Sequence, residues 1–380
     1  MNILNIIFWE PSYSPHKTQF FDSVGSLLKN CSVKAYAHSD IPKDRLSQGW
    51  KIDDNTITPW ILQPTNAMIR DVVAKDPKNT LHIFSGIRWV PTLIIALSEV
   101  KKTKARFAIM SEPRVGDGVK GTLRFIQSWL TEGWLRRNAE FILAIGRNGP
   151  PWFKSVGYNT DKIFAFAYFV NSPTPLGVSA EWEACDKAVR VGYVGRIVQE
   201  KGVFDLVRAI KILGTGASLS IVGGGSDKNA LIKLTKALCV AADFAGVLPI
   251  AEVGKAMARF DVLVLASTTK DDGWGVVVSE ALMCGTAIIS TNHVGASLLL
   301  EEPLFGRCVP SCDPQAIANA ILELQASGAF TSKQRQARRM LASARLSAEA
   351  GARYLAEIIN WTKERGLRPT PFNKYEVTRF

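Results

Sequence analysis

The chain has 380 residues, of which 47% are hydrophobic and 21% charged, and its formal net charge at pH 7 is +12. This composition is typical of a globular protein and excludes an intrinsically disordered chain, and the length favours two domains over one. No run of about 20 apolar residues occurs, so we expect no transmembrane helix. The first residues lack a basic stretch and a small-residue cleavage site, so no signal peptide is expected.

The cysteine pattern bears on metal binding and location, and the charge pattern bears on the class of ligand that the protein binds. Only Cys308 and Cys312 lie close together, without a second pair or a histidine cluster, so we expect reduced thiols, no metal site and a cytoplasmic location. Residues 1–172 carry 22 Lys and Arg against 14 Asp and Glu. Such positive charge suits nucleic acid, anionic lipid or a phosphorylated ligand. We do not expect nucleic acid, because no recognised motif or long basic run is present.

Strand and helix patterns alternate through residues 1–172. Helices are expected between most of the strands, for example over 18–30 and 91–102. Because such alternation produces a parallel sheet covered on both faces, this region is predicted to be a doubly wound, Rossmann-like α/β domain. The expected strands are 2–9, 32–38, 80–85, 106–111, 141–146 and 163–169.

The segment 120–138, KGTLRFIQSWLTEGWLRRN, mixes apolar and aromatic residues with basic ones and has one acid, Glu132. Its pattern permits two interpretations. The first is a core helix whose tryptophans pack under the sheet. The second is an interfacial helix that lies on an anionic membrane surface.

A linker rich in Pro, Gly and Ser follows at 171–188, after which the alternation resumes. We therefore predict a second Rossmann-like domain over 187–365, and a central cleft where the carboxyl ends of both sheets face one ligand. The helical tail at 347–366 is expected to cross back, with 366–380 packed on the first domain. The expected strands of the second domain are 189–195, 217–223, 243–247, 261–267, 286–291 and 306–309.

The loop after the first of these strands has the composition of a phosphate site. Gly195 permits a sharp turn, and Arg196 and Lys201 precede a predicted helix. Two cations beside the N–H groups of a helix N-terminus suit a diphosphate. The alternative is a pair of solvated loop cations.

Two further loops of this domain are candidates for ligand contact. The Gly-rich turn within 219–234 lacks the lysine and serine of a P-loop. The turn around Val247, in FAGVLP, offers backbone groups to the edge of a base.

The stretch 271–291, DDGWGVVVSEALMCGTAIIST, places a loop acid, Asp272, ahead of a helix acid, Glu280. Amides around Gly273, Trp274, Gly275 and Val276 are expected to point outward from the helix N-terminus. The two carboxylates would then address a sugar hydroxyl and a ribose diol, with a diphosphate between them. The alternatives are a polar loop for Asp272 and a solvated helix face for Glu280.

These motifs resemble those of the retaining glycosyltransferases of family four, which have the two-Rossmann GT-B architecture. GRIVQEKG at 195–202 matches the family's Gly-Arg…Lys-Gly loop, and DGWGVVVSEALMCG at 272–285 matches its acid-x7-acid motif in spacing. The departures are Asp272 for the usual Glu and Trp274 for the usual Phe. The resemblance covers about 190–300.

The resemblance implies a role for each matching residue. Arg196 and Lys201 would hold the donor diphosphate and stabilise it as the leaving group, and Glu280 would bind the ribose. Asp272 and the amides of 273–277 would hold the transferred sugar. Transfer would follow a dissociative, oxocarbenium-like path without a metal or other cofactor.

The first domain departs from the family pattern. Its first loop, 9–19, has His16 and Lys17 where many members have a Gly-Gly pair, and these two are candidates for binding a phosphate or the acceptor. Near the end of a middle strand it has Glu112 where some members have a histidine. We expect Glu112, or the leaving phosphate, to take the acceptor proton; a loop or capping role for Glu112 is the alternative.

The function implied is transfer of a sugar from a nucleotide-diphosphate-sugar to a saccharide acceptor, lipid-linked through a polyprenyl diphosphate, in cell-surface polysaccharide or glycolipid synthesis. Because many family members work on such acceptors at the cytoplasmic leaflet, we expect a peripheral protein on the inner face of the plasma membrane. The alternatives are a GT-B epimerase or phosphorylase, or a basic protein that binds nucleic acid.

Overall fold

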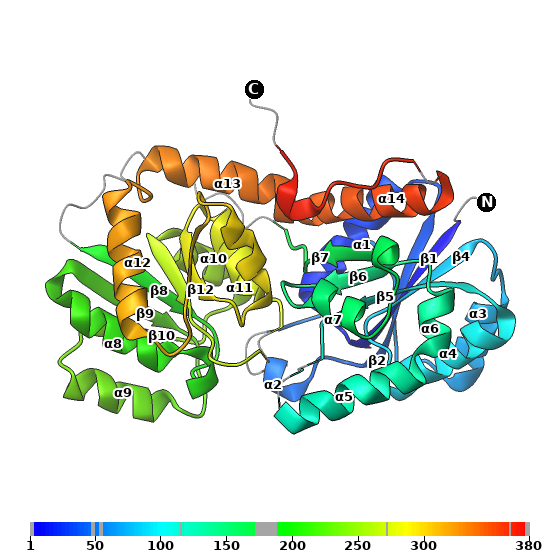
Figure 1. Ribbon diagram of the computed structural model, residues 1–380, viewed down its shortest axis with the longest axis horizontal. Helices are drawn as coiled ribbons and strands as arrows, with labels where there is room; N and C mark the ends of the chain where they lie inside the picture. The colour runs from blue at the N-terminus through cyan, green and yellow to red at the C-terminus, as the bar shows by residue number, and fades with distance from the viewer. Residues whose placement is uncertain are drawn as a thin grey trace. The chain divides into compact units, whose positions relative to one another are not determined.

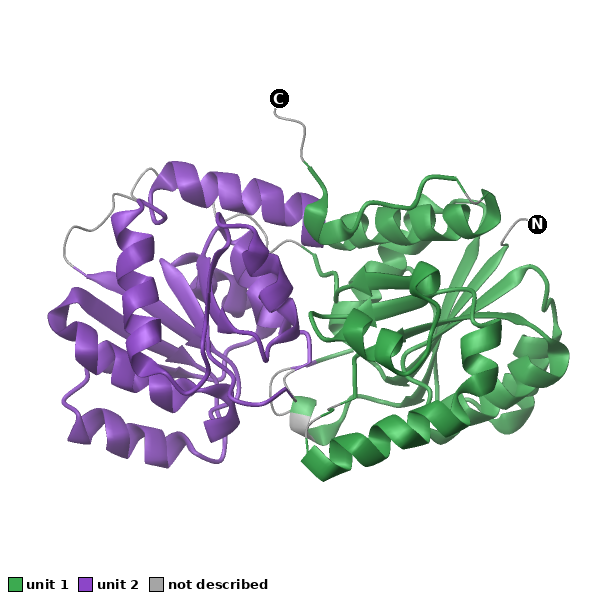
Figure 2. Ribbon diagram, viewed as in Figure 1, with its two compact units in different colours: residues 1–46, 51–171, 347–376 green, residues 47–50, 172–346, 377–380 purple. Residues whose placement is uncertain are grey.

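The computed structural model describes residues 4–46, 50–52, 56–114, 116, 118–171, 188–270, 273–364 and 366–376. These divide into two compact units (Figure 2). The first unit is built from residues up to 46, 51–171 and 347–376, and the second mainly from 188–346. Each unit contains one parallel sheet flanked by helices (Figure 1).

The first unit has, within its described residues, seven strands in the order β3-β2-β1-β4-β5-β6-β7. The order reverses between β1 and β4, so the sheet is doubly wound, as predicted. All six expected strands are confirmed; the edge strand β3 is additional, because three residues cannot establish a two-residue period. The strands are β1 (Asn5–Ser12), β2 (Ser32–Ser39), β3 (Trp60–Leu62), β4 (Thr80–Phe84), β5 (Arg106–Ser111), β6 (Ile142–Ile145) and β7 (Ile163–Phe166).

Strand β1 extends further than its expected end at residue 9. It pairs with β4 as far as Trp9 and only with β2 beyond that residue. The missing N–H of Pro11 is therefore tolerated, because the strand is already an edge there. The extension carries Glu10 to the carboxyl end of the sheet, where its side chain is buried.

Helices of the first unit begin at residues that favour a helix start. Pro15 and Pro91 occupy first-turn positions of α1 and α4. The Thr65 side chain caps α3 by accepting a hydrogen bond from the Met68 N–H at 3.3 Å. The helices are α1 (Pro15–Leu27), α2 (Lys43–Leu46), α3 (Asn66–Ala74), α4 (Pro91–Thr103), α5 (Gly118–Thr131), α6 (Gly133–Asn138), α7 (Gly149–Ser155) and α14 (Ala348–Glu364).

The sheet of the second unit has, in the described part of the chain, six strands in the order β10-β9-β8-β11-β12-β13. All six expected strands are confirmed, and the order again reverses, here between β8 and β11. The strands are β8 (Val189–Val194), β9 (Ala217–Val222), β10 (Ala242–Gly246), β11 (Val262–Leu265), β12 (Ala287–Thr291) and β13 (Gly306–Val309). The helices are α8 (Val203–Leu213), α9 (Lys228–Ala237), α10 (Ile250–Ala258), α11 (Val276–Met283), α12 (Pro314–Ala326) and α13 (Ser332–Leu346).

The chain returns to the first unit through α14, as expected from the helical tail. This helix packs against α1, and the Ala348 N–H donates to the Val170 carbonyl at 3.1 Å. The return comes at Ser347, earlier than the boundary at 366 expected from the sequence. The reason is the apolar face of α14, which is buried in the first unit.

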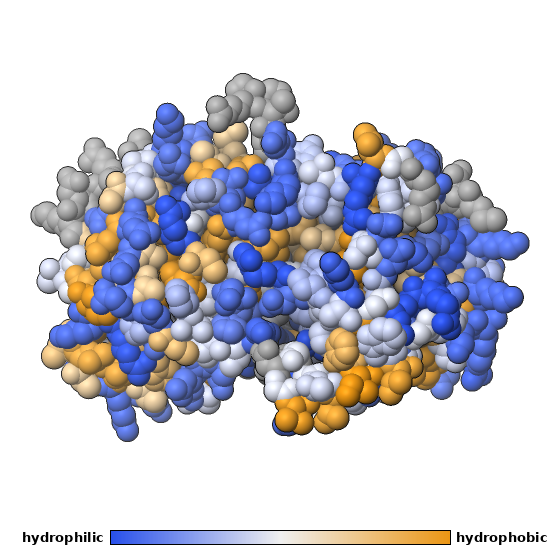
Figure 3. All heavy atoms as spheres, viewed as in Figure 1, coloured by the Kyte–Doolittle hydropathy of each residue, from blue (hydrophilic) through white to orange (hydrophobic). Residues whose placement is uncertain are grey.

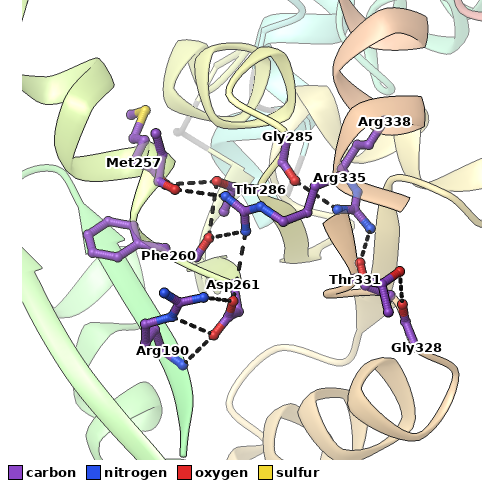
Figure 4. Close-up of polar contacts among 12 residues, drawn as sticks. Arg190, Met257, Phe260, Asp261, Gly285, Thr286, Gly328, Thr331, Arg335 and Arg338 are labelled. Atoms are coloured by element: carbon purple, nitrogen blue, oxygen red, sulfur yellow. Dashed lines mark hydrogen bonds and ion pairs between the residues drawn. The ribbon is translucent and has the colours of Figure 1, made fainter. Parts of the chain in front are cut away.

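Two buried arginines fasten α13 to the second unit (Figure 4). Arg335 donates to the carbonyls of Phe260 at 2.6 Å and Ala258 at 2.7 Å, and Arg338 donates to that of Gly285 at 2.8 Å. Burial lowers the pKa of both groups to about 10, so both remain charged at neutral pH. Because Gly285 follows α11 directly, these contacts fix the carboxyl-terminal end of that helix.

Candidate functional site

The reversal of strand order between β8 and β11 brings two loops of the second unit together. The Thr268 N–H donates to the Glu200 carbonyl at 2.8 Å. Gly202 has φ +69°, and a Cβ there would lie 1.9 Å from the Ala266 carbonyl oxygen. Only glycine fits so close to a neighbouring backbone. Such a reversal is where ligands bind in doubly wound sheets.

The loop after β8 has a fixed backbone and an exposed cation. The Ile197 N–H donates to the Gly224 carbonyl at 2.8 Å, and the Gln199 N–H donates to Asp227 Oδ2 at 2.9 Å. The Arg196 side chain is exposed, whereas Lys201 is half-buried at the end of the short helix η2 (Gln199–Lys201). The two predicted cations thus stand on one short loop ahead of α8.

The glycine turn after β9 lies next to this loop and next to Val247. The Gly223 N–H donates to the Gly246 carbonyl at 2.7 Å. A Cβ on Gly224 would lie 3.2 Å from Val247 Cγ2. Val247 is half-exposed, so the loops after β8, β9 and β10 present one continuous edge.

The loop before α11 is held by backbone hydrogen bonds. Gly295 and Ala296 donate N–H groups to the carbonyls of Gly273 at 2.7 Å and Trp274 at 2.8 Å. The Trp274 ring is 1% exposed and donates to Ser279 Oγ at 2.9 Å. It is therefore a packing residue, and its backbone is the part available to a ligand. The two acids Asp271 and Asp272 lie outside the described residues.

Helix α11 begins at Val276, as expected, and Gly275 precedes it with φ +79°. No side chain among the described residues caps this N-terminus, so its first N–H groups are suited to a ligand anion. Glu280 is the fifth residue of the helix and is partly buried. Burial raises the pKa of its carboxyl from 4.5 to about 7. A carboxyl so perturbed at a ligand-binding edge is a candidate functional group.

The first unit has a separate polar cluster at its own reversal, between β1 and β4. Lys17 Nζ lies 2.6 Å from Glu10 Oε2 and 3.0 Å from Ser85 Oγ. It also lies 5.2 Å from the centre of the Tyr168 ring. The Tyr168 hydroxyl is hydrogen-bonded to Glu112, and burial beside this acid raises the tyrosine pKa well above its usual value.

This cluster bears on the charges of Lys17 and His16, the two residues predicted to bind a phosphate or the acceptor. The Lys17 charge is balanced by Glu10, which is 1% exposed. Burial, and secondarily the charge of Arg45, lowers the pKa of His16 to about 4, so it is neutral at pH 7 and offers hydrogen bonds without charge. Sequence reasoning missed Glu10 and Tyr168; the available signal was a single acid at the end of an apolar strand.

In the described part of the chain, no three His, Cys, Asp or Glu side chains lie close enough together to hold a metal ion. None of the described helices is long and apolar enough to cross a membrane.

Similar folds occur among solved structures. The Anabaena protein HepE, in complex with UDP, superposes with a TM-score of 0.70 at 16% sequence identity, over 95% of this chain and all of the other. The two units of this chain therefore have the GT-B fold.

The sequence comparison matches part of the second unit to a known family. Residues 179–345, less than half of the chain, match the model of the family described as glycosyl transferases group 1. The chain is 28% identical over 187 residues to the amylovoran biosynthesis glycosyltransferase AmsK of Erwinia amylovora, covering 47% of this chain and 46% of the relative. It is 27% identical over 222 residues to a GDP-mannose-dependent phosphatidylinositol monomannoside mannosyltransferase of Mycobacterium tuberculosis, covering 56% and 54%. The chain spans about half the length of these relatives.

Proposed function

We propose that the protein is a retaining glycosyltransferase of the hexosyltransferase type. It moves a sugar from a nucleotide-diphosphate-sugar to a hydroxyl of a saccharide acceptor. One arrangement carries this proposal: two cations, Arg196 and Lys201, on the loop at the β8–β11 reversal, next to the loop that leads to the N-terminus of α11.

Each group of this site has a place in the reaction. Arg196 and Lys201 neutralise the leaving diphosphate, and the α11 amides add the partial positive charge of a helix N-terminus. Glu280 binds the ribose hydroxyls as an acceptor. Asp272 holds the transferred sugar, with the Gly273–Val276 backbone beside it. On this dissociative path the bond to the diphosphate breaks and the acceptor hydroxyl attacks from the same face, so the anomeric configuration is retained without an enzyme nucleophile.

The first unit is assigned to the acceptor. In this proposal Glu112, which accepts a hydrogen bond from the Tyr168 hydroxyl, orients an acceptor hydroxyl, and either this carboxylate or the leaving phosphate takes the proton. His16 adds a neutral hydrogen-bonding group on α1. The Glu10–Lys17 pair gives this edge of the sheet a fixed geometry.

We further propose that the acceptor is lipid-linked and that the enzyme acts in cell-surface polysaccharide or glycolipid synthesis, peripherally on the inner face of the plasma membrane. Two relatives support this, since one acts in amylovoran biosynthesis and the other on a phosphatidylinositol mannoside.

The test is a panel of UDP-, GDP-, ADP- and TDP-sugars. A cognate donor should stabilise the protein by about 2.7 kcal/mol at a hundredfold excess over Kd. Product analysis then separates the alternatives: a transferred sugar with retained configuration supports the proposal, whereas an epimerised donor or a sugar phosphate supports an epimerase or phosphorylase. Stronger, salt-sensitive stabilisation by DNA would point to nucleic-acid binding instead.

A further inference from the structure

Helix α5 has an apolar stripe that faces away from the protein. Four large residues at spacings of four, three and four follow one line along it: Val119, Leu123, Ile126 and Leu130. They are 79%, 61%, 47% and 78% exposed, respectively. Figure 3 shows a band of hydrophobic residues along the edge where Figure 1 places α5.

The opposite side of α5 is the one that packs on the first unit. Gly121 and Ser128 are buried, and Phe125 packs against the hydrophobic core. Each of these three residues comes two positions after a residue of the stripe. Because successive residues of a helix are rotated by about 100°, a separation of two positions is a rotation of about 200° around the helix axis. The stripe is therefore nearly opposite the packed side, and its exposure is a property of the helix rather than of one side chain.

Segment 120–138 forms two helices, α5 and α6, and a different one of the two interpretations fits each helix. Trp134 of α6 packs against the core and stacks on Phe107, with ring centres 4.9 Å apart. Arg136 donates to the carbonyls of Trp129 at 2.7 Å and Val156 at 3.0 Å, so it is a structural residue. The core interpretation thus fits α6, and the outward apolar surface belongs to α5.

The charged residues of α5 are all positive. Lys120 is exposed and Arg124 is half-buried, and no acid occurs between 118 and 131. Apolar residues exposed along several turns cost free energy in water and mark an interaction surface. A second copy of the chain would bring like charges together with no acid of α5 to pair them, whereas an anionic bilayer accepts both the apolar stripe and the cations.

We propose that this stripe, Val119, Leu123, Ile126 and Leu130, is the membrane-docking surface of the protein, lying in the headgroup region of an anionic leaflet. Lys120 and Arg124 contact the lipid phosphates. The role of the surface rests on the proposed lipid-linked acceptor, because docking would bring the first unit to the acceptor's membrane.

The test is co-sedimentation with vesicles of phosphatidylglycerol and of phosphatidylcholine at low salt. Wild type should prefer phosphatidylglycerol, and the preference should fade as salt rises. Leu123→Asn with Leu130→Asn should reduce binding to phosphatidylglycerol by about tenfold or more, since two leucines no longer enter the bilayer. Lys120→Ser with Arg124→Ser should remove the preference between the lipids.

Matched controls come from the second unit. Leu322→Asn with Met340→Asn changes two exposed apolar residues, and Lys233→Ser with Lys236→Ser removes the same charge from α9. Both should bind as wild type does. Absence of wild-type binding, equal loss in the controls, or unchanged binding of the leucine variant would overturn the proposal. A wild-type dimer that the leucine variant converts to monomer, without vesicle binding, would assign the stripe to a second copy.

Vesicle binding and donor turnover distinguish failure of the membrane-docking proposal from failure of the proposed function. Vesicle binding without turnover of any donor sugar rejects the glycosyltransferase and keeps the surface. Donor turnover without vesicle binding rejects only the surface.

Discussion

Lys17 and Glu10 form an ion pair at the carboxyl edge of the first sheet, with Lys17 Nζ 2.6 Å from Glu10 Oε2. Ser85 Oγ donates to the other carboxylate oxygen at 2.6 Å. The three residues come from α1, the end of β1 and the position after β4. The ion pair and the Ser85 hydrogen bond therefore connect α1, β1 and the end of β4, which meet where the strand order reverses.

Breaking this pair should destabilise the fold. In Lys17→Met the buried Glu10 carboxylate loses its cation, so the free energy of unfolding should fall by about 3–5 kcal/mol at neutral pH. Urea unfolding of the variant and of wild type measures this.

A double variant provides the control. Lys17→Met with Glu10→Gln removes the charge as well as its partner and should recover much of the lost stability. A double variant that is no more stable than Lys17→Met would show that the pair does not carry the effect.

Glu280 should make nucleotide binding depend on pH. Its folded pKa is raised to about 7, above the ordinary 4.5, so its contribution to stability is present below the unfolded pKa and lost as pH rises through about 7. Ribose hydroxyls donate to the charged form. The affinity for UDP or another cognate nucleotide should therefore increase as pH rises through about 7. In Glu280→Gln, calorimetry should find weaker binding without this step; a step of the same size would exclude Glu280 as its source.

The cations of the β8 loop should affect turnover and not folding. Arg196→Ala and Lys201→Ala should each cost about 2.7–4 kcal/mol of transition-state stabilisation, which is about 10²–10³ in rate. The matched control is Lys211→Ala, an exposed cation on α8 away from the loop. Initial rates with the cognate donor measure the effect on turnover, and melting temperatures measure the effect on folding. Near wild-type turnover in either loop variant is inconsistent with the assignment.

Asp272 should act on the reacting sugar. Asp272→Asn is expected to lower kcat, whereas an increase in KM alone would show a ground-state contact. Asp272→Glu restores the residue usual in the family. Abolished turnover in that variant would indicate a pocket built around the shorter acid, and improved turnover a contact that the aspartate reaches poorly.

Two glycines at the ends of α8 both have positive φ, +69° at Gly202 and +59° at Gly214, but a Cβ collides with Ala266 only at Gly202. Gly214→Ala should cost about 1–3 kcal/mol of unfolding free energy for its strained backbone and leave donor binding unchanged. Gly202→Ala should cost about 3 kcal/mol and reduce donor binding, because the collision separates the two loops. Unchanged donor binding in Gly202→Ala would refute this packing.

Local patterns predicted most of the fold and much of the second unit's site. Strands of buried apolar residues and loops with Gly195, Arg196 and Gly275 are visible in single stretches of sequence. The Glu10–Lys17–Tyr168 cluster is not, because Tyr168 is far along the chain from Glu10 and Lys17, and the three meet only at the sheet edge. The sequence also did not determine which side of α5 packs on the first unit. A 3.6-residue period defines two faces of a helix, but it does not indicate which face is buried.

The central claim is that the β8 loop and the α11 N-terminus bind the diphosphate of a nucleotide-sugar. The most direct measurement is calorimetric titration of wild type and Arg196→Ala with the cognate nucleoside diphosphate and with its nucleoside. We predict that wild type binds the diphosphate much more tightly than the nucleoside, and that Arg196→Ala loses most of this difference while its affinity for the nucleoside is unchanged. Equal affinity of wild type for the two ligands, or an undiminished difference in the variant, would contradict the claim.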